Sequence, residues 1–215
     1  MLRILALALI IVAGCSFGSG NLESKHSSDL ESRRIRRIAV LPPEPTGAMA
    51  SKTASTQPPL QQSDAPEMLA KQIYSAMASL PNWQIVADSE VQQVEQIKPA
   101  VTGPARVRQI GEMVFADAVM VGRLERFRER VGDDWGVKSP ASVAFVLDLV
   151  DVRRGDVIWS ARFDETQKAL TENIFALGDI SQRGVRWLSA EQLTVTGVKK
   201  AVGQLHQILA RPASL

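Results

Sequence analysis

The sequence predicts an α/β fold in which helices pack on one mixed β-sheet. In the first half of the chain, strand-like apolar runs alternate with segments of helical periodicity, a pattern typical of parallel strands. In the second half, strand-like runs follow one another with only turns between them, which indicates an antiparallel meander. The chain has 215 residues, and we expect a single domain with one core over residues 35–215.

The first strand is expected over residues 35–41, because Pro42 ends an apolar run there. Residues 42–63 are rich in Pro, Ser, Thr and Gln and predict a long mobile loop. A helix then begins with Asp64 as its N-cap and Pro66 in its first turn. Its apolar stripe consists of Leu69, Ile73, Met77 and Leu80.

The start of the first strand carries a cluster of basic residues. The cluster consists of Arg33, Arg34, Arg36 and Arg37. Two interpretations are open: contact with anionic lipid or lipopolysaccharide phosphates, or a solvated start of the strand.

A short strand and two further helices follow. The strand is expected over residues 83–86, and Ser89 and Gln92 have the spacing of an N-terminal cap for the next helix. This helix bears Val91, Val94 and Ile97 on one face. After a break at residues 99–104, another helix bears Val107, Ile110 and Val114.

The second half of the chain predicts three consecutive strands. They occupy residues 117–130, 143–152 and 157–163, joined by turns at 132–136 and 153–156. The C-terminal region is mostly helical in pattern. Its last helix is expected to begin at a capping box made by Ser189 and Gln192, and Gly197 is expected to interrupt it. The stripe of this helix consists of Val198, Val202, Leu205 and Leu209.

The first fifteen residues have the features of an export signal. Arg3 supplies a positive charge, and residues 4–13 form an apolar run that is too short to remain as a membrane-spanning helix. The run ends in Val12-Ala-Gly-Cys15, which resembles a bacterial lipobox, and Cys15 is the only cysteine in the chain. We therefore expect a signal peptide over residues 1–14 and lipidation of Cys15, with palmitate among the acyl groups. The alternative is a signal or buried helix that happens to contain a cysteine.

Residues 15–34 are polar and have no hydrophobic period, which predicts a lipidated flexible tether. Its typical reach of about 25 Å would keep the domain close to the membrane. Ser16 stands where lipoproteins of this kind carry Asp when they stay in the inner membrane. The resemblance therefore implies the periplasmic face of the outer membrane.

The composition argues against several classes of function. Without the signal peptide, 24 Lys and Arg (25 minus Arg3) stand against 23 Asp and Glu, so nucleic-acid binding is not expected. The two histidines are His26 and His206, too few for a Ser/His/Asp or Cys/His catalytic system or for a metal site. Adjacent carboxylates such as Asp133-Asp134 are typical of turns. We expect no enzyme and no cofactor; a hydrolase would need a cleft that holds two carboxylates.

Several stretches together resemble a group of bacterial envelope lipoproteins. Besides Cys15, these stretches are Ile38-Ala-Val-Leu-Pro42, Gln84-Ile-Val86, Ala116-Asp-Ala-Val-Met-Val-Gly122 and Val157-Ile-Trp-Ser160. The group comprises the curli-secretion lipoprotein, the Pel polysaccharide export lipoprotein and the activators of penicillin-binding proteins, with a core similar to the N-terminal domain of TolB. The resemblance covers residues 36–163. It implies a non-enzymatic assembly, secretion or activator module, often oligomeric.

The candidate binding residues are aromatic side chains near arginines. Trp135 lies in a polar turn between two long strands and close in sequence to Arg126, Arg128 and Arg130, and Trp and Arg are enriched at interface hot spots. The alternative is that Trp135 folds back onto the sheet. Trp187 precedes the Ser189 cap and serves either as a hydrophobic staple or as an interface anchor.

Two hypotheses on function follow. The first is an outer-membrane lipoprotein that acts as a scaffold, assembly or export accessory and binds an envelope protein or copies of itself. The second is a module that binds an envelope glycan, polysaccharide or peptidoglycan, against Trp135 and the arginine-rich strand.

Overall fold

The computed structural model describes residues 21–42, 64–97, 103–132, 137–167 and 187–210. The main sheet consists of β1 (Leu22–His26), β2 (Arg37–Leu41), β3 (Gln84–Ile85), β4 (Ala118–Arg128), β7 (Ser142–Asp151) and β8 (Val157–Thr166). A small second sheet pairs β5 (Val131–Gly132) with β6 (Val137–Ser139). The helices are α3 (Ala65–Ala78), α4 (Asp88–Ile97), α5 (Gly103–Met113), α7 (Ala190–Leu209) and the 3-10 turn η1 (Leu30–Ser32).

The main sheet has six strands in the order β1-β8-β7-β4-β2-β3. Strand β2 runs parallel to both β3 and β4, whereas β4, β7, β8 and β1 pair antiparallel. The predicted fold class is confirmed: a single α/β domain with a parallel first half and an antiparallel second half. None of the helices in the described ranges is long and apolar enough to cross a membrane.

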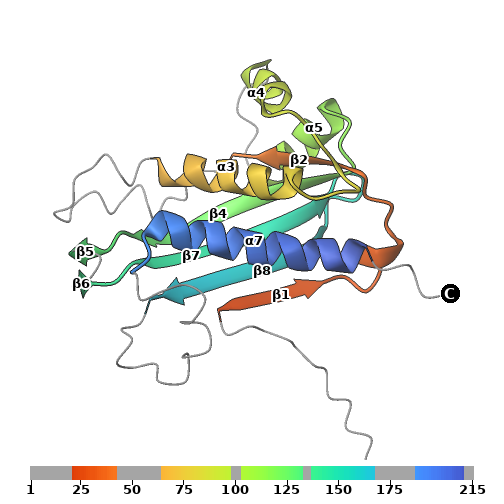
Figure 1. The fold of residues 1–215 in the computed structure, drawn as a ribbon. Helices are drawn as coiled ribbons and strands as arrows, with labels where there is room; N and C mark the ends of the chain where they lie inside the picture. The colour runs from red at the N-terminus through yellow and green to blue at the C-terminus, as the bar shows by residue number, and fades with distance from the viewer. Residues whose placement is uncertain (1–20, 43–63, 98–102, 133–136, 168–186, 211–215) are drawn as a thin grey trace, which may run out of the picture.

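Helices cover the two faces of the sheet unequally. Figure 1 shows α3 and α7 next to each other over one face, where they enclose the larger core with Ile38, Met120 and Phe145. On the opposite face, α4 and α5 pack on β2 and the start of β4 around Ala39 and Val119, in a smaller core. On that face, the rest of β4, β7 and β8 carries the paired charged side chains described below.

The predicted tether is wrong for much of its length, because residues 22–26 form edge strand β1. This strand pairs with β8 from Leu22 opposite Phe163 to His26 opposite Trp159. Leu22 is buried in the main core, and the four residues after it are exposed. A strand with one inward-facing apolar residue has no detectable hydrophobic period, which explains why the sequence pattern did not indicate it.

One guanidinium joins this N-terminal segment to the turn between β7 and β8. The Arg33 side chain, 7% exposed, lies 2.8 Å from Asp29, 2.9 Å from Asp151 and 3.0 Å from Asp156. Asp151 also accepts the backbone N–H groups of Arg153 and Arg154, at 2.9 and 3.0 Å. The hydrogen bonds from Arg33 hold the pKa values of Asp29 and Asp156 below their usual range. Both predicted roles of the basic cluster, lipid contact and a solvated strand start, are therefore wrong for Arg33.

Gly197 does not interrupt the last helix, which is continuous from Ala190 to Leu209. A Cβ atom at Gly197 would lie 2.7 Å from the ring of Phe163, a distance shorter than real contacts. Phe163 is itself fully buried and stacks on Phe145 with ring centroids 5.1 Å apart. Glycine is therefore required here for the close approach of α7 to β8, and not for a break.

The predicted helix caps form to different degrees. Asp64 is the N-cap residue of α3, but its side chain makes no capping hydrogen bond. The Ser189–Gln192 capping box is present in both directions, as predicted. Helix α4 begins earlier than expected, at Asp88, and Gln92 donates to the Asp88 carboxylate at 2.6 Å instead of pairing with Ser89. The loop predicted over residues 42–63 lies outside the described residues, apart from Pro42.

Replacement of Gly197 tests the close contact between α7 and β8. Gly197→Ala should lower the free energy of unfolding by about 1–3 kcal/mol, because the added methyl overpacks against Phe163. Gly203→Ala in the same helix is the matched control, since a Cβ there meets no atom within 4 Å. It should raise stability by about 0.5–1 kcal/mol through helix propensity. Denaturant unfolding measures both, and equal effects of the two variants would contradict this account.

Replacement of Arg33 tests the ion cluster. At pH 7, Arg33→Gln should lower the free energy of unfolding by about 3–5 kcal/mol, because Asp151 stays buried without its cation. Lys71→Gln removes the exposed Lys71–Glu67 pair and should cost less than about 1 kcal/mol.

The pH dependence gives a second measure of the Arg33 cluster. Carboxylates with a lowered pKa stabilise the fold above their ordinary pKa of 3.8, and this contribution is lost as the pH falls through the lowered value. Unfolding curves of the native protein should therefore lose stability steeply below about pH 4, and those of Arg33→Gln should be flatter. An equally steep acid limb in the variant would contradict the role assigned to Arg33.

Candidate functional site

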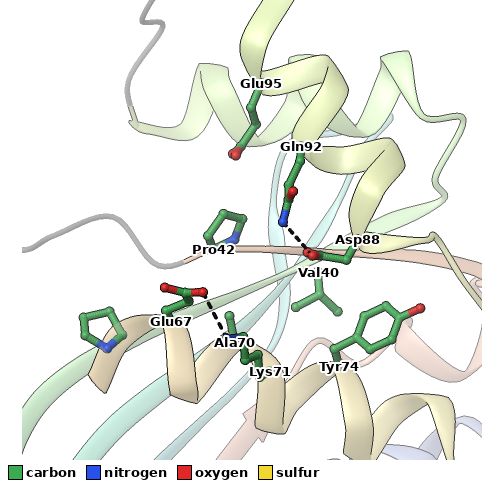
Figure 2. Close-up of a pocket in the computed structure, with 10 residues that line it drawn as sticks. Val40, Pro42, Glu67, Ala70, Lys71, Tyr74, Asp88, Gln92 and Glu95 are labelled. Atoms are coloured by element: carbon green, nitrogen blue, oxygen red, sulfur yellow. Dashed lines mark hydrogen bonds and ion pairs between the residues drawn. The ribbon is translucent and has the colours of Figure 1, made fainter. Parts of the chain in front are cut away.

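A groove of about 590 Å³ lies between α3 and α4 at the carboxyl end of β2. Figure 2 shows its side chains converging from both helices over Val40 and Pro42. Its lining consists of Val40, Pro42, Pro66, Glu67, Ala70, Lys71, Tyr74, Asp88, Gln92 and Glu95. Helix α3 contributes one wall and α4 the other, while the end of β2 forms the floor.

The chain topology explains why a groove forms here. After β2 the chain continues into α3 on one face of the sheet, whereas after the neighbouring parallel strand β3 it continues into α4 on the opposite face. Adjacent parallel strands whose connections leave to opposite faces create a crevice at their carboxyl ends. Ligands of open α/β sheets bind in crevices of this kind.

The groove combines an apolar floor with acidic side chains on its walls. Lys71 lies 3.1 Å from Glu67, and Gln92 donates to Asp88 at 2.6 Å (Figure 2). Glu95 forms an ion pair with Arg106. Three carboxylates therefore stand against one ammonium group in the lining, beside the partly exposed ring of Tyr74. Carboxylate, amide and phenol groups together can hydrogen-bond hydroxyl or ammonium groups of a ligand.

The described part of the chain shows no grouping of three or more His, Cys, Asp or Glu placed to hold a metal ion. His206, one of the two histidines, stacks on Trp83 with ring centroids 5.4 Å apart and lies 3.2 Å from the Pro81 carbonyl oxygen. This histidine therefore has a packing role.

Arg126, Arg128 and Arg130, the predicted binding arginines, lie at the end of β4 but differ in their surroundings. Arg126 donates to the Ser142 hydroxyl at 2.7 Å and forms an ion pair with Asp164. Its hydrogen bond holds the pKa of Asp164 below the usual range. Arg128 is exposed and Arg130 is partly buried. Of the three, Arg126 is thus engaged within the sheet, and Arg128 is the most open to solvent.

Arg126 belongs to a network of ion pairs across the face of β4, β7 and β8 that lies opposite α7. Arg123 lies 3.2 Å from Asp148, and Arg162 lies 2.5 Å from Glu125 and 3.3 Å from Asp164. Beneath these side chains, Ala144 is buried although it faces the same side. The charged residues of β4, such as Arg123 and Arg126, therefore help to cover this face of the sheet.

Trp187 lies at the same end of the sheet as these arginines. The Glu129 carboxylate, next to Arg128 and Arg130, accepts the backbone N–H of Ala190 at 3.1 Å, at the first turn of α7. This bond brings the segment before α7 against the end of β4. Trp187 is partly exposed, and Leu188, one residue closer to the cap, packs against the main core. The staple position therefore belongs to Leu188.

Two of the predicted site residues, Cys15 and Trp135, lie outside the described residues. The structure thus brings Arg128, Arg130 and Trp187 to one end of the sheet. The groove residues Tyr74, Asp88 and Gln92 were not predicted, because in sequence they are ordinary polar positions on helix surfaces. They line one groove because two chain connections leave to opposite faces of the sheet, which no local sequence pattern indicates.

No protein-family model matches the sequence, and no curated protein is similar to it in sequence. Several solved structures are similar to the chain. A point variant of the PelC dodecamer from Paraburkholderia phytofirmans is 15% identical, with a TM-score of 0.50 over 86% of this chain and 98% of that chain. A second PelC dodecamer structure from the same organism has a TM-score of 0.48 at 15% identity, over 89% and 98%. The LpoB C-terminal domain from Escherichia coli has a TM-score of 0.38 at 15% identity, over 61% and 83%. The resemblance to envelope lipoproteins that the sequence predicts is thereby confirmed at the level of the fold.

Proposed function

We propose that the chain is a lipoprotein of the outer membrane that acts in the periplasm as an assembly or export accessory. It catalyses no reaction; it binds an envelope protein or further copies of itself. The lipobox-like sequence ending in Cys15 supports the envelope location, and the shared fold with PelC supports an accessory role.

The observation that carries this proposal is where the chain leaves the domain. Strand β1 begins at Leu22, opposite Phe163 and near the carboxyl end of β8. Five residues separate Asn21 from Cys15, so the two positions are at most about 20 Å apart. A lipid on Cys15 would therefore hold this end of the sheet near the bilayer, together with Arg128 and Trp187. Arginine and tryptophan side chains are well suited to a membrane–water interface.

The exposed edge of strand β1 supports the proposal that copies of the chain associate. The strand is an outer edge of the six-stranded sheet, and its antiparallel register directs the backbone groups of Leu22, Ser24 and His26 away from β8. Such an edge can pair with another strand. The structure that shares this fold is described as a dodecamer, which supports assembly of several copies here.

Replacement of Cys15 tests the anchor. The native full-length chain should fractionate with membranes, and Cys15→Ser should move to the soluble periplasmic fraction because it cannot accept lipid. Mass spectrometry of the mature N-terminus should show a lipidated Cys15. A bare thiol, or residues retained before it, would contradict the proposed location.

Assembly is tested with the detergent-solubilised full-length chain by size-exclusion chromatography with light scattering. Ser24→Pro removes an outward N–H from β1 without altering a side chain in the core, so it should reduce self-association. Ser24→Ala, which keeps the N–H, is the matched control and should assemble like the native chain. A monomer at high concentration in both the native chain and Ser24→Ala would leave only a heterologous envelope partner.

A second candidate function, glycan binding, is favoured by the groove between α3 and α4. Its size suits a small oligosaccharide, and its carboxylate, amide and phenol groups suit sugar hydroxyls. This moves the predicted glycan contact away from Trp135 and the arginine-rich strand.

Calorimetry with N-acetylglucosamine oligomers tests this second function. Tyr74→Ala and Gln92→Ala should each weaken binding by roughly tenfold, since each removes a group that lines the groove. Arg162→Gln, on the opposite half of the sheet, is the control and should bind like the native chain. Absence of binding, or equal binding by all variants, would remove the glycan hypothesis.

A further inference from the structure

Phe115 combines two unfavourable features on the surface of the domain. Its side chain is 82% exposed, the most exposed of the large apolar residues described. Its backbone has φ of 52°, in the left-handed region that favours glycine. Residues held in such conformations are concentrated at functional sites, because the surrounding structure must maintain them at a cost.

The strain at Phe115 has a specific structural cause. The residue occupies the position after the C-cap of α5, where the N–H of Ala116 bonds to the Gly111 carbonyl at 2.9 Å and that of Phe115 to the Glu112 carbonyl at 3.3 Å. This pair of bonds defines a Schellman motif, whose left-handed residue is usually glycine. Glycine would meet the backbone requirement at Phe115 without strain, so the aromatic ring serves some purpose other than ending the helix.

Hydrogen bonds bring two other segments to this corner. Arg37 Nε donates to the Val114 carbonyl at 3.1 Å, and the Asp117 carboxylate accepts the N–H groups of Arg36 and Arg37, each at 2.9 Å. The Asp117 carbonyl accepts the N–H of Val152 at 3.1 Å. The strand start that carries Arg36 and the turn that follows β7 therefore lie beside Phe115.

These two segments carry exposed arginines at the corner of the domain where Phe115 lies. Arg34, Arg36 and Arg153 are exposed, and none of them makes a side-chain ion pair within the described ranges. The acids at this corner have partners: Glu112 pairs with Arg108, Asp156 pairs with Arg33, and Asp117 accepts the two backbone N–H groups named above. We refer to Phe115, Arg34, Arg36 and Arg153 as the Phe115 patch.

We infer that the Phe115 patch binds an acidic segment of a protein partner, with Phe115 as the apolar anchor and the three arginines as its charge complement. Aromatic residues and arginine are the side chains most enriched at binding hot spots. The inference deepens the proposed accessory function and rests on it for the kind of partner.

The position of the patch favours a protein over the anchoring bilayer. The patch lies at the end of the sheet where β7 ends and β8 begins, whereas the chain leaves the domain near the other end of β8. From Val157 to Phe163, opposite Leu22, the strand rises about 20 Å. If the end of the sheet near Leu22 is held at the membrane, the Phe115 patch faces into the periplasm.

The probe for this inference is a short fluorescent peptide in which Glu alternates with Leu, titrated by anisotropy into the full-length chain in detergent. We expect saturable binding that weakens with salt. Phe115→Gly and Arg36→Glu should each weaken it by roughly tenfold or more. Two controls, Ile97→Ser at another exposed apolar residue and Lys138→Glu at an exposed cation in β6, should leave the affinity unchanged.

Thermal unfolding separates a binding role from a structural one. Phe115→Gly should raise Tm by about 2 °C while it weakens peptide binding, because glycine relieves the left-handed strain. A lowered Tm, or an affinity equal to that of the native chain, would overturn the inference.

Vesicle binding tests the membrane as an alternative ligand. Phe115-dependent binding to phosphatidylglycerol vesicles in preference to the peptide would also overturn the inference, because it would assign the patch to a membrane. Membrane fractionation through Cys15 is independent of Phe115, so its outcome reports separately on the proposed function.

Discussion

The geometry of the domain depends on the interaction of Arg33 with three aspartates. This nearly buried guanidinium fixes the N-terminal segment to the turn between β7 and β8, and so fixes the position of β1 beside β8. A charge at this depth is tolerated because each nitrogen of the guanidinium donates to a carboxylate. One of these carboxylates, Asp151, also closes the turn through two backbone N–H groups. The direction in which the chain leaves the sheet follows from this arrangement.

The two ends of the sheet differ in chemistry. At the end of the sheet where the chain leaves the domain, Glu129 accepts a hydrogen bond from the first turn of α7. This bond holds α7 against the end of β4, so Arg128 and Trp187 lie at the same end. At the opposite end, Phe115 is exposed, and the nearby strand start and turn carry the exposed Arg36 and Arg153. The groove between α3 and α4 lies at the sheet's parallel half. The proposed accessory function, which joins a membrane to a second component, needs separate surfaces of this kind.

Much of the fold could be predicted from local sequence patterns, because periodicity, caps and turn residues act over a few positions. The Ser189 capping box and the hairpin at Gly155, with φ of 74°, are of this kind. Strand β1 could not be predicted, since its pairing with β8 depends on a contact made far along the chain. The role of Gly197 could not be predicted for the same reason, because the ring that requires a glycine there belongs to β8. The candidate arginines were found by composition, but the engagement of Arg126 by Asp164 depends on strand register.

Strand β1 also determines how the domain would bear a mechanical load. A pull on the N-terminus along the strand axis would shear β1 against β8, so that all of its ladder hydrogen bonds resist together instead of opening one at a time. The Arg33 cluster locks the far end of the same segment and prevents it from sliding. Attachment through this strand therefore suits a protein held at a surface that moves relative to its partners.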